Sequence, residues 1–288
     1  MLLSDHKPEF HHLQSNGAKS LLTAVTVLIC ACTQAPSLHS DPPKTDTLTV
    51  HICSTLPYHH IDIFIFADTL TRPLESHTRV GSDPFLKLPA GRGDKLIVAL
   101  ADVRGSFGSA LPERYSTMER LTMNYADEDP GAPLQAGQGS GGTGRTVELN
   151  ILPLLCPVSI RSISIAADAP LCGAVAQLER VNASAEILRM DGFHPGSTID
   201  SPAGLANPLM MLRELPEDIG SSPIPTDIIL WCYPNEDDDG PGGGCTRLLV
   251  TGTVAGSRMA WRIPLGKIRR GARPELDITL KNDYLCEL

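Results

Sequence analysis

Apolar residues recur at every second position in many short runs of this chain, and this period of two most restricts how it can fold. Leu48 to Cys53 (LTVHIC), Thr146 to Ile151 (TVELNI) and Arg247 to Val254 (RLLVTGTV) all alternate in this way. Successive side chains of a β-strand point to opposite faces, so these runs predict strands with one buried face. With 25 Gly and 24 Pro to form turns, the pattern predicts an all-β fold.

One strand is predicted to be covered on both sides. In Ile61 to Phe66 (IDIFIF), the isoleucines occupy one face, while Phe64 and Phe66 occupy the other. Both faces are therefore apolar, as in the interior of a sandwich.

The remaining strand signals are weaker but regular. Val158 and Ile160 share one phase and Ile163 and Ile165 the other, which predicts a bulge or bend. The sequence Ala255 to Ser257 predicts a tight hairpin turn. Further strands are expected at residues 95–101, 228–233, 259–263 and 276–280, and short helices at residues 112–123 and after Asn207-Pro208.

A length of 288 residues suffices for two domains with separate cores. We expect the join between residues 152 and 157, giving an N-terminal β-sandwich domain at residues 46–155 and a C-terminal one at residues 156–288.

The N-terminus predicts export and lipidation. Leu21 to Ala31 is a continuous apolar stretch, too short to span a bilayer as a helix and of the length of a signal-peptide core. It runs into a sequence that resembles the bacterial lipobox, with Ile29 and Ala31 at the third and first positions before Cys32. This interpretation makes residues 1–31 a signal peptide, Cys32 the lipidated residue and residues 32–45 a tether. An ordinary apolar helix is the alternative.

The charge balance argues against nucleic-acid binding. The formal net charge is −9, which has the wrong sign for a phosphate backbone as partner. The basic group Lys267, Arg269, Arg270 and Arg273 is interpreted as a solvated turn.

No catalytic motif has its required context. Gly139 to Thr146 (GSGGTGRT) is one residue away from a phosphate-binding loop, but Arg145 replaces the lysine and a strand follows where a helix is needed. We interpret residues 137–144 as a flexible Gly/Ser linker. No nucleophile elbow stands on a strand-to-helix turn, so we predict a non-enzymatic protein without a cofactor.

Two segments could be interpreted as metal sites. His51, Cys53, His59, His60 and Asp62 cluster in the sequence, although surface imidazoles beside a strand explain them equally.

The acidic segment that begins at Asn235 is the second of these. Asp237 and Asp239 fit two positions of a calcium loop, but Thr246 stands where the bidentate Glu is required. We expect an acidic hairpin loop without a metal, with Asp237 and Asp239 as weak candidate ligands.

The cysteines leave several pairings open. Beyond Cys32, six cysteines remain, enough for disulfides in an exported protein. A bond between Cys232 and Cys245 could close the acidic hairpin, but spacing alone does not select this pairing.

The C-terminal half resembles a known family. The segment "TDIILWCYPNEDDDGPGGGCTRLLVTGTVAGSRMAWRIPL" is similar to the signature of FimB-like minor fimbrial subunits, anchor proteins of the Bacteroidales-type type V pilus. The matching residues are Cys232, Tyr233, Pro234, Asn235, Thr246, Arg247, Leu248, Val250, Gly252, Gly256, Ile263 and Pro264. The N-terminal half agrees more loosely, through "IDIFIFAD", "LPAGRGDKLIVALADV" and "APLQAG".

This resemblance implies two tandem transthyretin-like β-sandwich domains and no enzymatic activity. It also implies a lipid-anchored outer-membrane protein whose partners are fimbrial shaft or accessory pilin subunits joined by β-strand addition. Shaft subunits of the family are cut after an Arg near the mature N-terminus. Here the first Arg after Cys32 is Arg72, which favours an uncut anchor or accessory subunit. Leu48 to Cys53 and Leu276 to Leu280 are the candidate edge strands for assembly.

A different function class remains open. The chain could be a surface adhesin or a glycan-binding lipoprotein, with Trp231, Trp261 or the acidic loop at its binding site.

Overall fold

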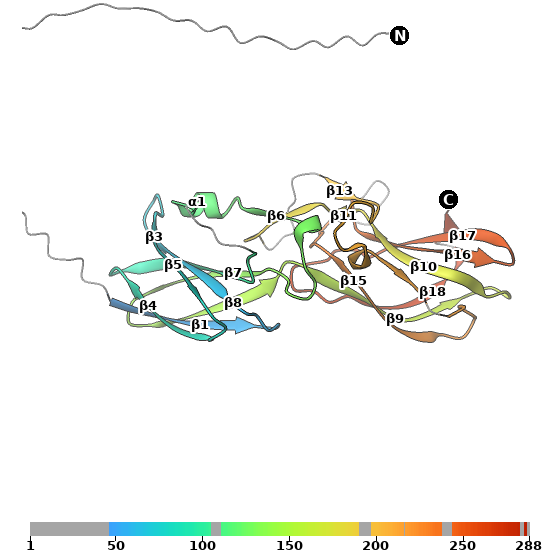
Figure 1. The fold of residues 1–288 in the computed structure, drawn as a ribbon, viewed down its shortest axis with the longest axis horizontal. Coiled ribbons are helices and arrows are strands. Elements are labelled where there is room, and N and C mark those ends of the chain that lie inside the picture. The colour runs from blue at the N-terminus through green and yellow to red at the C-terminus, as the bar shows by residue number, and fades with distance from the viewer. Residues whose placement is uncertain are drawn as a thin grey trace, which may run out of the picture. The chain divides into compact units, whose positions relative to one another are not determined.

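The structure is a computed structural model that describes residues 46–104, 111–189, 197–215, 217–237, 244–282 and 285–286. Within these residues the regular structure is β-strand apart from a four-residue α-helix, α1 (Tyr115–Met118), and two 3₁₀ turns, η1 (Tyr125–Asp127) and η2 (Pro208–Met210). The predicted all-β fold is confirmed (Figure 1).

Strands from the first half of the chain form one seven-stranded sheet that we call the N-terminal sandwich. Its strands are β1 (Asp46–Ser54), β2 (Ile61–Ala67), β3 (Leu74–Val80), β4 (Phe85–Ala90), β5 (Asp94–Ala101), β7 (Gln135–Gly142) and β8 (Thr146–Pro153). The order across the sheet is β3-β2-β5-β7-β8-β1-β4 (Figure 1). Apolar side chains of β1, β4 and β8 share one buried cluster with those of β2 and β5, so the sheet closes over its own core.

The two-sided burial predicted for β2 is confirmed. Ile61, Ile63 and Ile65 lie inside the N-terminal sandwich. Phe64 and Phe66 point the other way, into a second cluster that continues into the C-terminal half.

The expectation of a flexible linker at residues 137–144 is wrong, because most of this segment is strand β7, paired with β5 from Gln135 to Gly142. Its glycines are required by close packing. A Cβ atom on Gly137 would lie 2.1 Å from the backbone oxygen of Asn150, and one on Gly139 would lie 2.6 Å from Leu149 Cδ2. Glycine in a strand interior often marks such a close approach.

The second half of the chain forms the C-terminal sandwich, from two sheets. One has the order β15-β9-β18 and the other β14-β10-β16-β17-β19. The strands are β9 (Cys156–Ile165), β10 (Leu171–Glu179), β14 (Leu212–Glu214), β15 (Ile224–Cys232), β16 (Arg247–Val254), β17 (Ser257–Pro264), β18 (Glu275–Leu280) and β19 (Leu285–Cys286). Between them, β11 (Val181–Asn182) pairs with β13 (Thr198–Ile199).

Local expectations for this half hold in two places and fail in a third. The register of β9 shifts against both neighbours near Arg161, as the phase change predicts. Ala255 and Gly256 have positive φ angles of 47° and 83° and join β16 to β17 directly, which is the geometry of a two-residue type I′ turn. The helix predicted after Asn207 is reduced to the single 3₁₀ turn η2, because Leu212–Glu214 of the predicted helix is strand β14.

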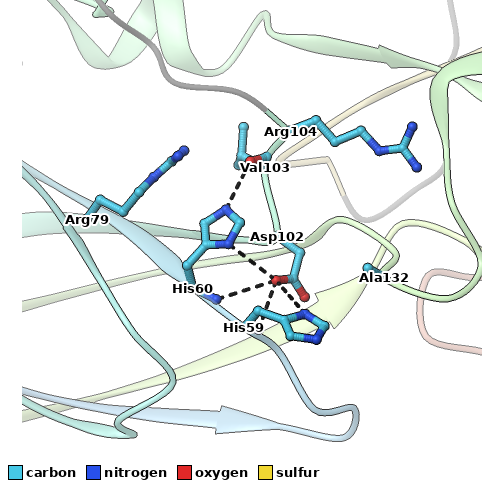
Figure 2. Close-up of a pocket in the computed structure, with 7 residues that line it drawn as sticks. All are labelled: His59, His60, Arg79, Asp102, Val103, Arg104 and Ala132. Atoms are coloured by element: carbon cyan, nitrogen blue, oxygen red, sulfur yellow. Dashed lines mark hydrogen bonds and ion pairs between the residues drawn. The ribbon is translucent and has the colours of Figure 1, made fainter.

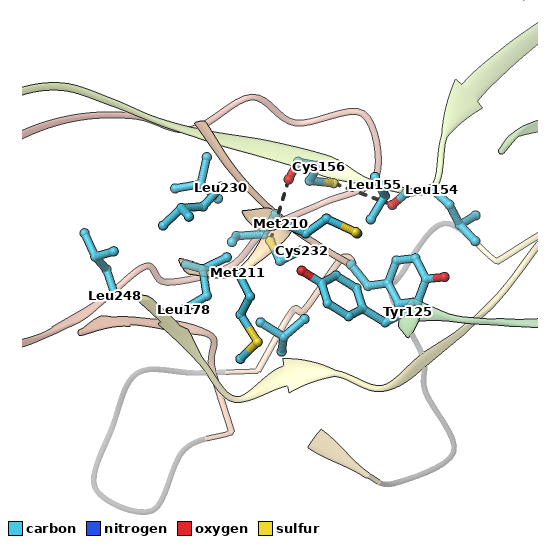
Figure 3. Packing of buried hydrophobic residues seen from close by; sticks show 14 of the residues in the cluster. Tyr125, Leu154, Leu155, Cys156, Leu178, Met210, Met211, Leu230, Cys232 and Leu248 are labelled. Atoms are coloured by element: carbon cyan, nitrogen blue, oxygen red, sulfur yellow. Dashed lines mark hydrogen bonds between the residues drawn. The ribbon is translucent and has the colours of Figure 1, made fainter. Parts of the chain in front are cut away.

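A continuous apolar cluster links the two sandwiches. It runs from Phe64 and Leu100 of the N-terminal sandwich to Leu155, Leu230 and other residues of the C-terminal one, and Figure 3 shows its central part. A short pair, β6 (Thr122–Asn124) with β12 (Ser184–Glu186), also crosses between the two halves. The described residues belong to one compact unit, so the division into two domains at residue 155 stays a prediction.

Arg270 lies in this junction, and its assignment to a solvated turn is wrong. The residue is 5% exposed. Its Nη2 donates to the carbonyl oxygens of Leu152 at 3.0 Å and Ala136 at 3.4 Å, and its Nη1 donates to those of Ile187 and Arg189. Burial lowers the pKa of Arg270 to about 10. The guanidinium therefore ties backbone of the N-terminal sandwich to backbone of the C-terminal half.

Glu128 is a second buried charge-bearing group at the junction. Its Oε1 accepts a hydrogen bond from the Tyr233 hydroxyl at 3.2 Å, and its Oε2 a long one from the Leu134 amide at 3.5 Å. The Tyr233 ring meets Tyr125 edge-on, and the Tyr125 hydroxyl donates to the Trp231 carbonyl at 2.7 Å. Burial raises the pKa of Glu128 to about 7, despite hydrogen bonds and Arg104, which lower it.

The packing of β7 predicts a strong effect of a single methyl group. Gly137→Ala places its Cβ against main-chain atoms that cannot rotate away, so it should destabilise the fold by about 3 kcal/mol or more. Gly81→Ala is the matched control, because nothing lies within 4 Å of its Cβ. Urea denaturation measures both variants. Equal stabilities would show that β7 does not lie against β8 as described.

The Glu128 carboxyl predicts a fall in stability as the pH rises. The unfolded chain ionises Glu128 near pH 4.5, while the folded protein holds the proton to about pH 7. Folding is therefore progressively disfavoured between these values, by about 3 kcal/mol in total. Glu128→Gln should remove this part of the pH dependence, whereas Glu148→Gln, at an exposed carboxyl, should not. Urea denaturation at pH 5 and pH 8 measures the difference in the free energy of unfolding between the two pH values. A difference in Glu128→Gln as large as in wild type would contradict the prediction.

Candidate functional site

The first strand is an internal part of the N-terminal sandwich. Strand β1 pairs with β8 in parallel and with β4 in antiparallel, so that Val50 lies opposite Val147 on one side and Leu86 on the other. Leu48, Val50 and Ile52 are at most 3% exposed. The alternation of LTVHIC produces this arrangement, because every second side chain enters the core. Of the two candidate edge strands, β1 is therefore excluded.

The other candidate, β18, lies at an edge. It pairs in parallel with β9 and is the outer strand of its sheet within the described residues. A surface hollow of about 460 Å³ runs beside it, lined by Glu275 to Thr279, Lys281 and Ile263 of β17. An edge strand beside a hollow has free backbone groups for pairing with another chain.

Strand β4 is one of the two edges of the N-terminal sandwich, with β3 at the other, and two features limit the use of β4 for pairing. Pro89 has no backbone N–H to donate. Phe85, 63% exposed, stacks flat on the His51 ring at 4.3 Å between centroids.

The predicted cluster of His51, Cys53, His59, His60 and Asp62 is divided by the fold. Asp62 is buried and bonded to Arg79 and His77, with Arg79 Nη2 at 2.7 Å. His51 and Cys53 stay together on β1, with 3.8 Å between Cys53 Sγ and His51 Nδ1, while His59 and His60 lie together at Asp102. Within the described part of the chain, no three His, Cys, Asp or Glu side chains form a ligand set for a metal ion.

His59 and His60 surround Asp102, as Figure 2 shows. Asp102 Oδ1 accepts the backbone N–H of His59 at 2.9 Å and of His60 at 3.4 Å, and the imidazoles lie 3.4 and 3.7 Å from the same oxygen. Asp102 has a positive φ of 58°, a conformation in which aspartate is enriched. It holds the turn that leads into β2, and its buried Oδ2 has no partner. The sequence gives no signal for this role, because Asp102 is 42 residues away from His60.

The first residue of the acidic segment, Asn235, has a structural role. Asn235 is buried, exchanges two backbone hydrogen bonds with Ile268, and donates its side-chain amide to the carbonyl of Gly244 at 3.0 Å. Its Oδ1 accepts the Asp237 amide at 3.0 Å. Asp239 lies outside the described residues, so its weak candidacy as a ligand stays untested.

The disulfide considered between Cys232 and Cys245 is absent: both are free, buried thiols. Cys232 lies opposite Cys156 on the neighbouring strand, and its thiol points to the Cys156 carbonyl at 3.8 Å. Burial raises the pKa of the Cys156 thiol to about 11 and also raises that of Cys232. These thiols fill the core (Figure 3) and are poor nucleophiles.

The proposed lipidation residue, Cys32, lies outside the described residues, as does the rest of the leader. No helix in the described part of the chain is both long and apolar enough to cross a membrane.

Solved structures share this fold. An inferred cell adhesion protein from Bacteroides eggerthii superposes with a TM-score of 0.61 at 13% identity, over 84% of this chain and 88% of that one. A fimbrial assembly protein from Parabacteroides distasonis gives 0.51 at 11% identity, over 84% and 93%. The tip fimbrial protein Mfa3 from Porphyromonas gingivalis gives 0.53 at 8% identity, over 76% and 81%. No protein-family model and no curated protein matches the sequence.

The burial of the thiols predicts their reactivity. In the folded protein without reductant, maleimide should modify the exposed Cys172, while Cys156, Cys232 and Cys245 should react only after unfolding. Mass spectrometry of the labelled peptides measures this. A requirement for reductant before Cys232 and Cys245 react would show that they form a disulfide after all.

Proposed function

We propose that this chain is a minor fimbrial subunit, lipid-anchored through Cys32, that seats and terminates a type V pilus at the outer membrane. It carries out no catalysis. It joins shaft or accessory pilin subunits by β-strand addition, and the N-terminal lipid holds the assembly at the membrane.

The observation that carries this proposal is the place of β1. The strand fills the groove between β8 and β4 with its own buried side chains. The first Arg after Cys32 is Arg72, which follows β2 in the loop to β3. A cut after Arg72 would remove β1 and β2 together, and with them much of the core. A subunit that keeps its own first strand has no such groove for an incoming strand, which suits the end of a filament.

The open edge of β18 supports a contact with another subunit. Residues of β18 line the hollow beside Ile263, and a strand added at this edge would extend the sheet without disturbing the core. We assign the shaft contact to this edge.

The fold comparisons support a role in fimbriae or adhesion. The similar structures include a fimbrial assembly protein, a tip fimbrial protein and an inferred cell adhesion protein, and none of these is named as an enzyme. The identities of 8 to 13% carry the fold alone, so the position at the base of the filament rests on β1 and Cys32.

A surface adhesin is the second candidate, favoured by the adhesion role inferred for the similar protein from B. eggerthii. The structure narrows its binding site. Trp261 is 3% exposed and cannot stack on a sugar, so Trp231 and the acidic segment remain.

A pull-down from detergent-solubilised outer membrane tests the anchor. Wild type should co-purify with a polymeric pilin, and Cys32→Ala should release that pilin from the membrane fraction. Cys172→Ala is the matched control, because this thiol is exposed but outside the lipobox, and it should behave like wild type. A membrane-bound protein that brings down no pilin would exclude the anchor and favour the adhesin.

A further inference from the structure

One end of the N-terminal sandwich gathers the start of β1 and three loops. Lys95 pairs with Ala67, Asp94 with Gly142, and Asp46 with Ala90, while the Gly144 amide donates to the Thr47 carbonyl. The loops at residues 68–73, 91–93 and 143–145 therefore lie at the same end as Asp46. We call this end, formed by Asp46 and these loops, the tether end.

Leu70 is an exposed apolar residue of the tether end. It lies in the loop between β2 and β3, and its side chain is fully exposed, the most exposed of the large apolar residues in the described part of the chain. The loop itself is held firmly. The Arg72 amide donates to the Thr69 carbonyl, the Tyr115 amide donates to the Arg72 carbonyl, and the Arg72 guanidinium lies over the Tyr115 ring at 5.4 Å. A single exposed leucine is common on protein surfaces, so the case for an external apolar partner depends on the groups around Leu70 and on the tether.

Donors for phosphate lie around this leucine. A hollow of about 530 Å³ beside Leu70 is lined by the hydroxyl residues Thr69, Thr71 and Ser116, and by Arg114. Arg114 and, across the tether end, Arg145 are exposed and have no acidic partner among the described residues. Arginine and hydroxyl side chains suit a phosphate ester.

Charge alone does not attract this end to a lipid surface. Arg72 is paired with Asp68 and Arg92 with Asp46, and Glu119 also lines the hollow. The bases and acids nearly balance, so contact would depend on the leucine and on local donors, and little on salt.

The length of the tether determines which end faces the bilayer. Thirteen residues, Thr33 to Thr45, separate Cys32 from Asp46. The root-mean-square span of a thirteen-residue random coil is about 20 Å, whereas the nine residues of β1 extend over about 30 Å. A lipid on Cys32 would therefore keep the tether end closer to the membrane than the opposite end of the sandwich.

We propose that the tether end is a membrane-contact face, on which Leu70 enters the headgroup region of a phospholipid surface while Arg114 and Arg145 bind lipid phosphates. This inference rests on the lipidation of Cys32 proposed above. Contact at the tether end would fix the orientation of the subunit and direct the C-terminal sandwich, with its β18 edge, away from the bilayer.

The test places a tryptophan at the contact and supplies the anchor artificially. Residues 33–288, which contain the whole described fold, carry a hexahistidine tag in place of the leader and bind vesicles of phosphatidylethanolamine and phosphatidylglycerol with a nickel-chelating lipid. Leu70→Trp reports contact, and Leu209→Trp is the matched control at a half-exposed leucine of η2. Brominated acyl chains quench the fluorescence of a tryptophan that enters the bilayer. The fluorescence of the native Trp231 and Trp261 is measured in the chain without the added tryptophan and subtracted.

We expect quenching of the tryptophan at position 70 and not of that at position 209, with little change at higher salt. On vesicles without the chelating lipid, Leu70→Asp should lower binding about tenfold or more. Quenching at neither position, or equally at both, overturns the membrane-contact face. Because the tag replaces the lipid, this result is independent of Cys32. A pull-down in which Cys32→Ala stays at the membrane would instead overturn the anchor.

Discussion

The buried guanidinium of Arg270 determines how the two halves of this protein are held together. A charged group at 5% exposure is costly unless its N–H groups are bonded, and here the partners are carbonyl oxygens, two from the N-terminal sandwich and two from the segment that follows β12. Carbonyls can be placed this way only if β7, β8 and residues 187–189 converge on one point. The apolar cluster around Tyr125 and Leu155 then packs against a junction whose geometry is already fixed.

The same junction contains the residues that make the C-terminal signature recognisable. Tyr233 bonds to Glu128, the Pro234 carbonyl accepts from the buried Asn182 at 2.7 Å, and Asn235 closes a loop against Ile268. These contacts give Tyr233, Pro234 and Asn235 of the sequence "CYPN" a structural reason. These three residues of the motif therefore report how the C-terminal sandwich meets the rest of the chain.

The edge strands of the two sandwiches differ. In the N-terminal sandwich the chain supplies its own first strand to the interior of the sheet. The edges are β3 and β4, and β4 carries a proline and a stacked phenylalanine. In the C-terminal sandwich β18 ends its sheet beside a hollow. Unpaired strand edges are where β-sheet proteins associate, so the assembly contact proposed at β18 and the membrane contact proposed at the tether end lie in different halves of the protein.

The sequence alone determined the features that depend on local order. The alternation of β1, the double-faced β2, the bulge in β9 and the turn at Ala255 and Gly256 follow from side-chain period and backbone sterics, which act within a few residues. Sequence reasoning missed β3, β4 and β10, and took β7 for a linker. Their glycines and charges are poor strand signals, and only the close approach of β8 explains why Gly137 must lack a side chain.

Only the tertiary structure decided the roles of Arg270, Glu128 and Asp102, because their partners lie far away in the chain. Arg270 bonds to a carbonyl 134 residues away, and Glu128 to a hydroxyl 105 residues away. The tertiary structure also leaves Cys232 and Cys245 as free thiols. It makes β1 an internal strand and β18 an edge strand, although the sequence favoured both equally as edge strands. Strand period establishes that a segment is β, but hydrogen bonding between distant segments selects its neighbours, and this selection made β1 internal and left β18 open.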